Sequence, residues 1–100
     1  MNRNAVDSRP IFTARQGQYL AFIHSYTLVN GRPPAEADMM RFFRVTPATV
    51  HQMLLTLEHL GLISRKPGVP RSAIVIIERS ALPELKPAHI QPVKITVTGY

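Results

Sequence analysis

TPATVHQMLLTLEHLG, residues 46–61, carries the signals for both ends of a helix. The other segments are interpreted by their position relative to this helix. The Thr46 hydroxyl can accept hydrogen bonds from free amides of the first turn, and Pro47 has a backbone angle already suited to the first helical position. Gly61 readily takes the left-handed conformation at which helices end. Between these ends, apolar residues recur at helical spacing and predict one buried face. They are Val50, Met53, Leu54, Leu57 and Leu60.

The opposite face of this helix begins with small and polar side chains, none of which is acidic. A capped, uncharged first turn that follows a shorter helix is typical of the helix that a helix-turn-helix inserts into the DNA major groove. An ordinary amphipathic helix with a solvated face has the same pattern, and the stretch alone does not separate the two. The side chains on this face are Ala48, Thr49, His51 and Gln52.

Two further helices are expected before this stretch. Thr13 and Gln16 form the pattern of a capping box, in which each side chain satisfies a backbone amide at the helix start. Residues 30–34, NGRPP, are strong turn formers and should end this first helix. A second helix is expected over residues 35–43, and the linker 44–46 is as short as a helix-turn-helix requires.

The pattern changes after the third helix from helical to strand-like. Residues 62–65 and 73–78 are predicted to be short strands, and residues 66–71, KPGVPR, the tip between them. A hairpin directly after a helix-turn-helix is a wing, and basic side chains on it can contact phosphates beside the groove. A solvated, charged hairpin without DNA contact is the alternative. The basic residues of this hairpin are Arg65, Lys66 and Arg71.

The two ends of the chain differ from this middle part. Residues 1–12 are expected to form a flexible arm, and residues 81–100 contain three prolines that discourage regular structure. Residues 93–98 alternate apolar and polar side chains like a half-buried strand, which could join the wing, pair with a second copy or remain unpaired. We therefore expect one domain over residues 13–80. Its predicted fold class is mainly α with a small β-hairpin, a three-helix winged helix-turn-helix.

Composition supports a folded chain with an anionic partner. The chain has 100 residues, 45% of them hydrophobic, and a net charge of +6 from twelve basic and six acidic residues. Most of the basic residues are arginine, which can bond phosphates and base edges through two atoms at once. There is no cysteine and no apolar run long enough to span a membrane, so we expect a soluble cytoplasmic protein.

The sequence has no pattern that indicates an enzyme or a metal site. His51 and His59 lie about two turns apart on one predicted helix, which is too far for joint metal ligation, and His24 and His89 have no acidic partner at ligand spacing. Neither a G-x-S-x-G nucleophile motif nor a glycine-rich phosphate loop occurs. We therefore expect no catalytic residues, no metal and no cofactor.

Taken together, these segments resemble the DNA-binding domain of the LexA repressor family over about residues 12–77. The resemblance implies a winged helix-turn-helix that binds double-stranded operator DNA as a transcriptional regulator, expected to be a repressor and a homodimer. The family's second domain, which carries the self-cleavage activity, has no room in this sequence, so self-cleavage is not expected. The resemblance depends on the order and spacing of Thr13-Ala14-Arg15-Gln16, Gly31-Arg32-Pro33-Pro34, Thr46-Pro47, and Leu57 followed by Gly61-Leu62-Ile63.

The resemblance also implies which residues contact DNA. In the family the start of the third helix reads bases, and two adjacent glutamates there correspond to His51 and Gln52 of this chain. Gln52 can bond an adenine edge through two atoms, His51 can donate to guanine N7, and the Thr49 methyl can meet a thymine methyl. The matching base-reading positions are Thr46, Ala48, Thr49, His51 and Gln52. Phosphate contacts are expected from Arg15, Arg32, Arg65, Lys66 and Arg71.

Three positions depart from the family pattern. Ala35 stands where a threonine commonly caps the second helix, and Phe42 and Leu55 replace polar residues that face outward. Exposed apolar side chains at these two positions would suit a protein interface. A winged-helix module that binds another protein is therefore the alternative function, and its binding would depend little on salt.

Overall fold

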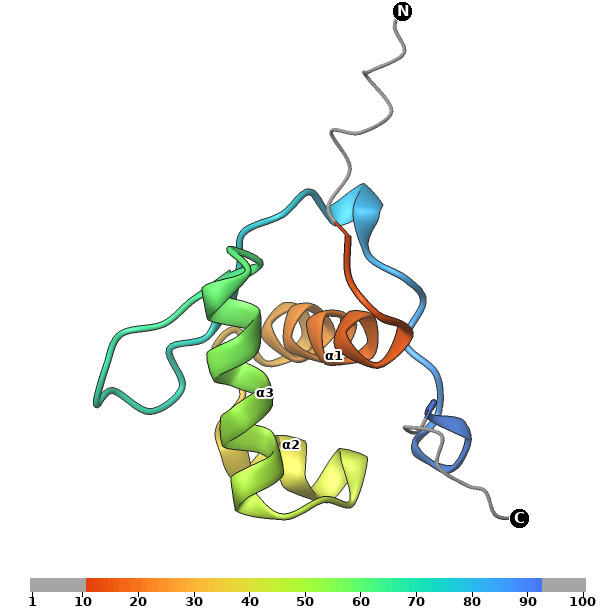
Figure 1. The fold of residues 1–100 in the computed structure, drawn as a ribbon, viewed down its shortest axis with the longest axis horizontal. Coiled ribbons are helices and arrows are strands. Elements are labelled where there is room, and N and C mark those ends of the chain that lie inside the picture. The colour runs from red at the N-terminus through yellow and green to blue at the C-terminus, as the bar shows by residue number, and fades with distance from the viewer. Residues whose placement is uncertain (1–10, 93–100) are drawn as a thin grey trace, which may run out of the picture.

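The computed structural model of the protein describes residues 11–92. Within that range the chain forms three helices, α1 (Ala14–Asn30), α2 (Glu36–Phe43) and α3 (Pro47–His59), which Figure 1 shows packed across one another. A hairpin of two short strands follows, and two single turns of 3-10 helix come after it, η2 (Arg79–Ala81) and η3 (Ala88–Ile90).

The hairpin consists of β1 (Ile63–Ser64) and β2 (Ile74–Val75), which pair antiparallel. Ile63 lies opposite Val75, and Ser64 lies opposite Ile74. Both strands are shorter than the predicted segments 62–65 and 73–78. The predicted fold class, mainly α with a small hairpin behind a helix-turn-helix, is confirmed.

The helices begin and end where local backbone chemistry predicts. Thr13 Oγ1 accepts from the Gln16 amide at 3.0 Å, and Gln16 Oε1 accepts from the Thr13 amide at 2.9 Å, so both halves of the capping box form. Thr46 Oγ1 accepts from the Thr49 amide at 3.2 Å and caps α3. After α1, Gly31 has a φ of 75°, a left-handed angle that glycine adopts without strain.

The second helix begins without a side-chain cap, because Ala35 has no acceptor on its side chain. The Asp38 carboxylate compensates in part, since its Oδ2 accepts from the Ala35 amide at 2.8 Å. At the other end of α2, Arg44 has a φ of 57° and donates its amide to the Met40 carbonyl. This left-handed residue turns the chain into α3 within three residues, as predicted.

The core lies where the three helices meet the hairpin. Tyr19 of α1 stacks on Phe43 of α2 with ring centroids 3.9 Å apart. Phe42 packs here too, with its ring centroid 4.8 Å from that of Phe22 and 4.9 Å from that of Phe43. The prediction of an outward-facing Phe42 is therefore wrong, because neighbouring aromatic rings half bury it. Leu55 remains 40% exposed, as predicted.

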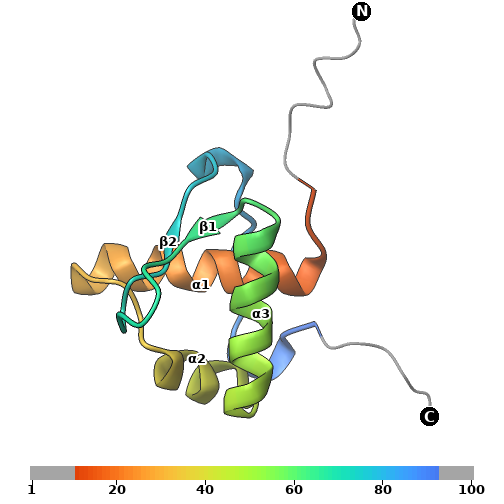
Figure 2. The same ribbon diagram turned by 60° about the vertical axis from the view of Figure 1, so that its left-hand side comes forward.

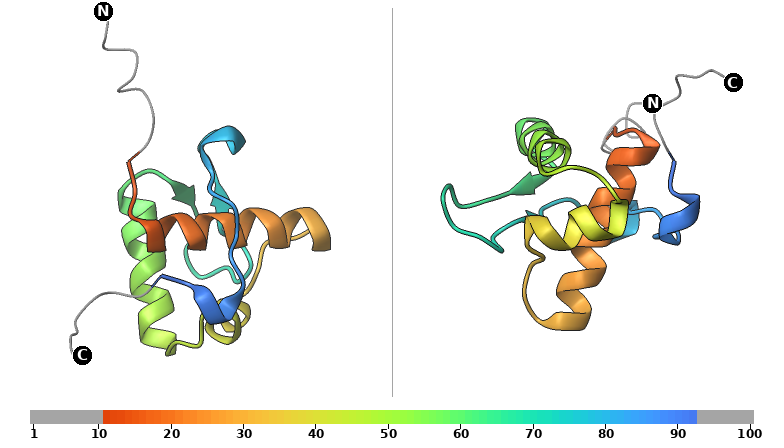
Figure 3. Two further views of the ribbon diagram at one scale, coloured as in Figure 1. Left: turned by 90° about the vertical axis from the view of Figure 1, so that its right-hand side faces the viewer. Right: turned by 90° about the horizontal axis from the view of Figure 1, so that it is seen from below.

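After β2 the chain crosses over α1, as the left panel of Figure 3 shows. We call residues 82–92 the strap. Gln18 of α1, only 2% exposed, holds the strap in place. Its Nε2 donates to the Glu84 carbonyl at 2.9 Å, and its Oε1 accepts from the Lys86 amide at 2.8 Å and from Gln91 Nε2 at 2.7 Å. Two strap side chains also pack against the core, Leu82 and Leu85.

The packed part of the molecule is therefore longer than the predicted domain, 13–80. The strap extends it beyond residue 80, and Phe12, predicted as part of a flexible arm, extends it at the other end. The Phe12 ring lies so close to Gly17 that a β-carbon on that glycine would come within 2.8 Å of it. Residues 1–10 of the predicted arm and the predicted strand 93–98 lie outside the described residues.

Candidate nucleic-acid interface

The third helix crosses the first half of α1, and Figure 2 shows its starting turns at the edge of the molecule. Its apolar stripe is buried at Val50, Leu54 and Leu57, while Leu60 is 49% exposed because it follows the helix end. The opposite face is left uncovered by the described part of the chain. All five predicted base-reading residues are exposed, namely Thr46, Ala48, Thr49, His51 and Gln52.

Some polar side chains on this face already form hydrogen bonds within the chain, and others do not. The hydroxyls of Thr46 and Thr49 lie 2.9 Å apart and bond one another, so both hydroxyls already have a partner within the chain. The Gln52 carbonyl accepts from the Thr56 hydroxyl at 3.0 Å within the helix. No described residue hydrogen-bonds the side-chain amide of Gln52, which leaves it available to a base edge.

A groove borders this face on the side of α1. The α1 groove is lined by the first turn of α1, by outward residues of α3 and by the end of the strap: Thr13, Ala14, Arg15, Gln16, Ala48, Thr49, Gln52, Met53, Thr56 and Pro92. Pro92 of the strap therefore lines the same groove as three of the predicted base-reading residues, Ala48, Thr49 and Gln52. Arg15, predicted to contact phosphate, donates from an Nη atom to the Pro92 carbonyl at 2.8 Å and lies 5.7 Å from the Tyr19 ring centroid. It would have to leave that carbonyl to meet a phosphate.

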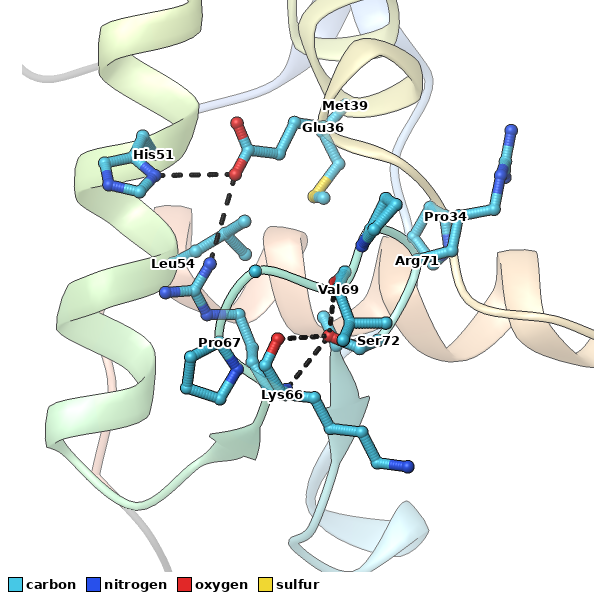
Figure 4. A pocket seen from close by; sticks show the side chains of 14 residues that line it. Pro34, Glu36, Met39, His51, Leu54, Lys66, Pro67, Val69, Arg71 and Ser72 are labelled. Carbon is cyan, nitrogen blue, oxygen red and sulfur yellow. Dashed lines mark hydrogen bonds and ion pairs between the residues drawn. The ribbon is translucent and has the colours of Figure 1, made fainter.

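A second groove lies on the other side of α3, between the start of α2, α3 and the wing (Figure 4). Glu36 of α2 reaches into this wing groove, and its Oε2 lies 3.4 Å from Nδ1 of His51 and 3.9 Å from an Nη atom of Arg65. Arg65 also donates from Nε to Glu58 Oε1 at 3.3 Å. The face predicted to lack acidic groups therefore has a carboxylate beside it, supplied by a different helix.

These contacts change the role expected for Arg65. Its side chain is 19% exposed and is held between Glu36 of α2 and Glu58 of α3. Such a position braces the wing against the two helices, because each ion pair joins a different element to the hairpin. Arg65 would have to leave these two carboxylates to make the predicted phosphate contact.

Arg71 is likewise directed into the molecule. One of its Nη atoms donates to the Tyr26 hydroxyl at 3.1 Å, to the Pro33 carbonyl at 3.3 Å and to Asp38 Oδ2 at 3.2 Å. Burial pushes the pKa of the Asp38 carboxyl upward, but the Ala35 amide and the charges of Arg71 and Arg41 outweigh it and hold that pKa below its ordinary value. Arg71 thus joins the wing to α1 and α2.

Three basic side chains remain exposed in the turns around α3. Ser72 Oγ accepts from the Lys66 amide at 3.0 Å and donates to the Val69 carbonyl at 2.8 Å, which shapes the wing tip while the Lys66 side chain extends away from the groove (Figure 4). Arg32, in the turn before α2, is exposed as predicted. Arg44, in the turn before α3, is also exposed. From sequence, Arg44 was predicted only as a linker residue, although its position as a basic residue directly before a groove-entering helix indicates a phosphate contact.

Three helices, a three-residue turn into an exposed third helix and a hairpin directly behind it define a winged helix-turn-helix protein. The sequence matches the family described as the LexA DNA binding domain over residues 10–72, which is more than half of the chain. The chain therefore belongs to this family of DNA-binding domains.

Relatives from several bacteria agree with this assignment. The LexA repressor of Thermotoga neapolitana is 42% identical over 60 residues, which are 60% of this chain and 30% of that protein. The LexA repressor of Thermosipho africanus is 39% identical over 64 residues, 64% of this chain and 32% of that protein. The LexA repressor of Clostridioides difficile is 33% identical over 88 residues, 87% of this chain and 41% of that protein. The chain thus spans less than half the length of these relatives.

Two kinds of feature are absent from residues 11–92. No helix there has both the length and the apolar character needed to cross a membrane. No three His, Cys, Asp or Glu side chains in that range gather closely enough to hold a metal ion.

Proposed function

We propose that this chain binds double-stranded DNA at specific sequences and represses transcription in the cytoplasm. The observation that carries the proposal is the exposed start of α3, which has a capped first turn and no acidic residue of its own, in a chain of net charge +6. Membership of a DNA-binding family and similarity to proteins named as LexA repressors support it. An α-helix of this kind fits the width of the major groove.

In this proposal the side chains of α3 read bases. Gln52, whose amide is free of partners among the described residues, bonds an adenine edge, and the methyl of Thr49 contacts a thymine methyl. Ala48 is small enough to let the helix approach the groove floor closely. His51 bonds a further base, as developed in the next subsection.

Phosphate contacts in this proposal come from the exposed cations of the turns, Lys66, Arg32 and Arg44. Arg65 and Arg71 act differently, since their ion pairs hold the wing against the helices and so position Lys66. Phosphate contacts of this kind fix the orientation of the helix on the duplex but carry no sequence information.

Selection of bound duplexes from a random pool would test the proposal directly. A preferred sequence should emerge, and Gln52→Ala should cost about 1 to 3 kcal/mol on that sequence while changing the affinity for unrelated duplexes much less. Leu55→Ala is the matched control, because Leu55 is also an exposed α3 residue but has no base-bonding group. If no sequence is enriched, or if Gln52→Ala weakens all duplexes equally, the proposed role of α3 is wrong.

The same selection addresses assembly. We propose that the protein binds as a homodimer, because two copies of a winged helix-turn-helix related by a twofold axis match two half-sites spaced by whole helical turns. A palindromic enriched sequence is the expected result. A single asymmetric half-site, bound with one protein per duplex, would contradict the dimer.

A further inference from the structure

The Glu36–His51 contact joins a residue outside the recognition helix to one of its base-reading side chains. Glu36 is the first residue of α2, and its carboxylate lies 3.4 Å from His51 Nδ1 across the wing groove. In Figure 4 the other ring nitrogen of His51, Nε2, points away from Glu36. The His51 side chain is 55% exposed, so a partner outside this chain can reach that nitrogen.

The chemistry of the two groups fixes where the ring carries its hydrogen. A carboxylate can only accept hydrogen bonds, so the ring nitrogen that faces Glu36 must be the protonated one. In the neutral ring, this leaves Nε2 without a hydrogen and makes it an acceptor. In the protonated ring, both nitrogens carry hydrogens, and Nε2 becomes a donor.

We propose that Glu36 is a positioning residue for base recognition, which holds the neutral His51 ring with Nε2 as a hydrogen-bond acceptor. This inference rests on the proposed function. As a donor, Nε2 would match N7 or O6 of guanine in the major groove. As an acceptor, it matches the amino group of adenine or cytosine. Glu36 therefore shifts the preference at this one position toward a base that offers an amino group.

The charged groups around His51 come from three elements. Glu36 from α2 faces the ring directly, and Arg65 from the wing lies 3.9 Å from the same carboxylate oxygen. Glu58, on α3 itself, pairs with Arg65 through the Arg65 Nε atom. Because Arg65 contacts the oxygen that faces the ring, the wing also restrains this pair.

The effect should appear in base discrimination rather than in folding. An ion pair as exposed as this one contributes little to the stability of the free protein. When a duplex covers α3, water leaves the contact and the same hydrogen bond becomes stronger. The orientation of the ring then influences which base is tolerated beneath it.

The experiment begins with the duplex that the wild-type chain selects. Binding of His51→Ala to its single-base variants identifies the base pair whose preference depends on His51. The wild-type protein and Glu36→Ala are then compared on all four base pairs at this position. Wild type should favour adenine or cytosine over guanine opposite His51, and Glu36→Ala should reduce that preference by about threefold to tenfold, the effect of one hydrogen bond.

The preference falls in Glu36→Ala because its neutral His51 ring can carry the hydrogen on either nitrogen. Glu36→Gln should restore part of the discrimination, because its amide oxygen can still accept from Nδ1. In His51→Ala, a second change of Glu36 to alanine should have no further effect on base preference. Lys66→Ala is the matched control and should weaken binding to all four base pairs alike.

Two results would overturn the inference alone while leaving duplex binding intact. One is a wild-type base preference at this position that persists unchanged in Glu36→Ala. The other is an equal loss of affinity on all four base pairs, which would show that Glu36 acts only on structure. A wild-type protein that retains no duplex would instead overturn the proposed function, and this inference with it.

Discussion

Asp38 is the residue on which the contacts between α1, α2 and the wing converge. Its carboxylate accepts from the Ala35 amide at 2.8 Å and from Arg41 at 2.6 Å, and it pairs with Arg71 of the wing at 3.2 Å. One side chain thus replaces the missing cap of α2 and fastens the hairpin. These partners favour the ionised form, which is why the pKa of Asp38 lies below its ordinary value despite burial.

Replacing this carboxylate should make folding less sensitive to acid. Because the pKa of Asp38 is lower in the folded state, the carboxylate stabilises the fold above the ordinary aspartate pKa of about 3.9, and this contribution is lost as pH falls through the folded-state pKa. Asp38→Asn should therefore reduce the free energy of unfolding by about 1 to 3 kcal/mol near neutral pH and progressively less in acid.

Urea unfolding of both proteins between about pH 2 and pH 7 measures this difference. The exposed Glu84, whose side chain has no described partner, provides the control Glu84→Gln, for which little change is expected at any pH. A difference between Asp38→Asn and wild type that stays constant over the whole range would contradict the assigned role.

Individual residues also show where prediction from sequence stops. Exposure of Gln52, His51 and Lys66 followed from helical spacing and turn composition, because both are local properties. Arg65 and Arg71 were predicted to be surface cations, but their partners are carboxylates on α2 and α3 that only the folded chain brings near. The sequence shows which side chains are charged, but which of them form ion pairs depends on the tertiary structure.

Among the elements, the strap is held neither by the packing of a helix face nor by strand pairing, but by side-chain hydrogen bonds. Gln18 is a buried polar residue whose amide group bonds three strap groups, two of them in the backbone. A buried glutamine is tolerated only when its hydrogen bonds are satisfied. The strap is therefore part of what makes this side of α1 stable.

Gln18→Ala should destabilise the protein by about 1 to 3 kcal/mol, because it leaves the Glu84 carbonyl and the Lys86 amide without their partner. Thermal unfolding measures the loss, and hydrogen exchange should show faster exchange of the Lys86 amide. Gln52→Ala, which changes an exposed glutamine of α3, is the matched control and should leave stability nearly unchanged. Equal melting temperatures for the two variants would argue that the strap adds nothing to stability.

The elements themselves were largely predictable, and the reason is local. The Thr13–Gln16 box, Gly31, the Thr46–Pro47 entry and Gly61 act over a few residues, so helix ends followed from sequence. The strap was predicted as a tail outside the domain, since its ties to Gln18 join residues far apart in the chain. No local sequence pattern predicts a contact between residues so far apart in the chain.

At the scale of the whole molecule, three of the exposed cations lie in the turns between the helices and in the wing. Arg32, Arg44 and Lys66 belong to the α1–α2 turn, the α2–α3 turn and the wing. Arg79 is also exposed, but it lies in η2, at the end of the molecule opposite the start of α3 (Figure 1). If DNA binds along α3, the first three should release counterions from the duplex and Arg79 should not.

Salt titrations test this arrangement. Lys66→Ala and Arg32→Ala should each weaken binding to every duplex and reduce the slope of log affinity against log salt by about 1, because each removes one phosphate contact. Arg79→Ala removes the same charge from the distant end and should leave the slope unchanged. A similar reduction in all three variants would mean that net charge, not its position, governs the binding.

The end of the strap has a practical consequence for measuring these interactions. Pro92 borders the α1 groove together with Thr49 and Gln52, and the hold of Arg15 on it is through the backbone carbonyl, which any residue supplies. Since the chain has no cysteine, Pro92→Cys would create a unique attachment point for a fluorescent dye. Its emission would change as a duplex approached, so association could be followed in real time with every α3 side chain intact.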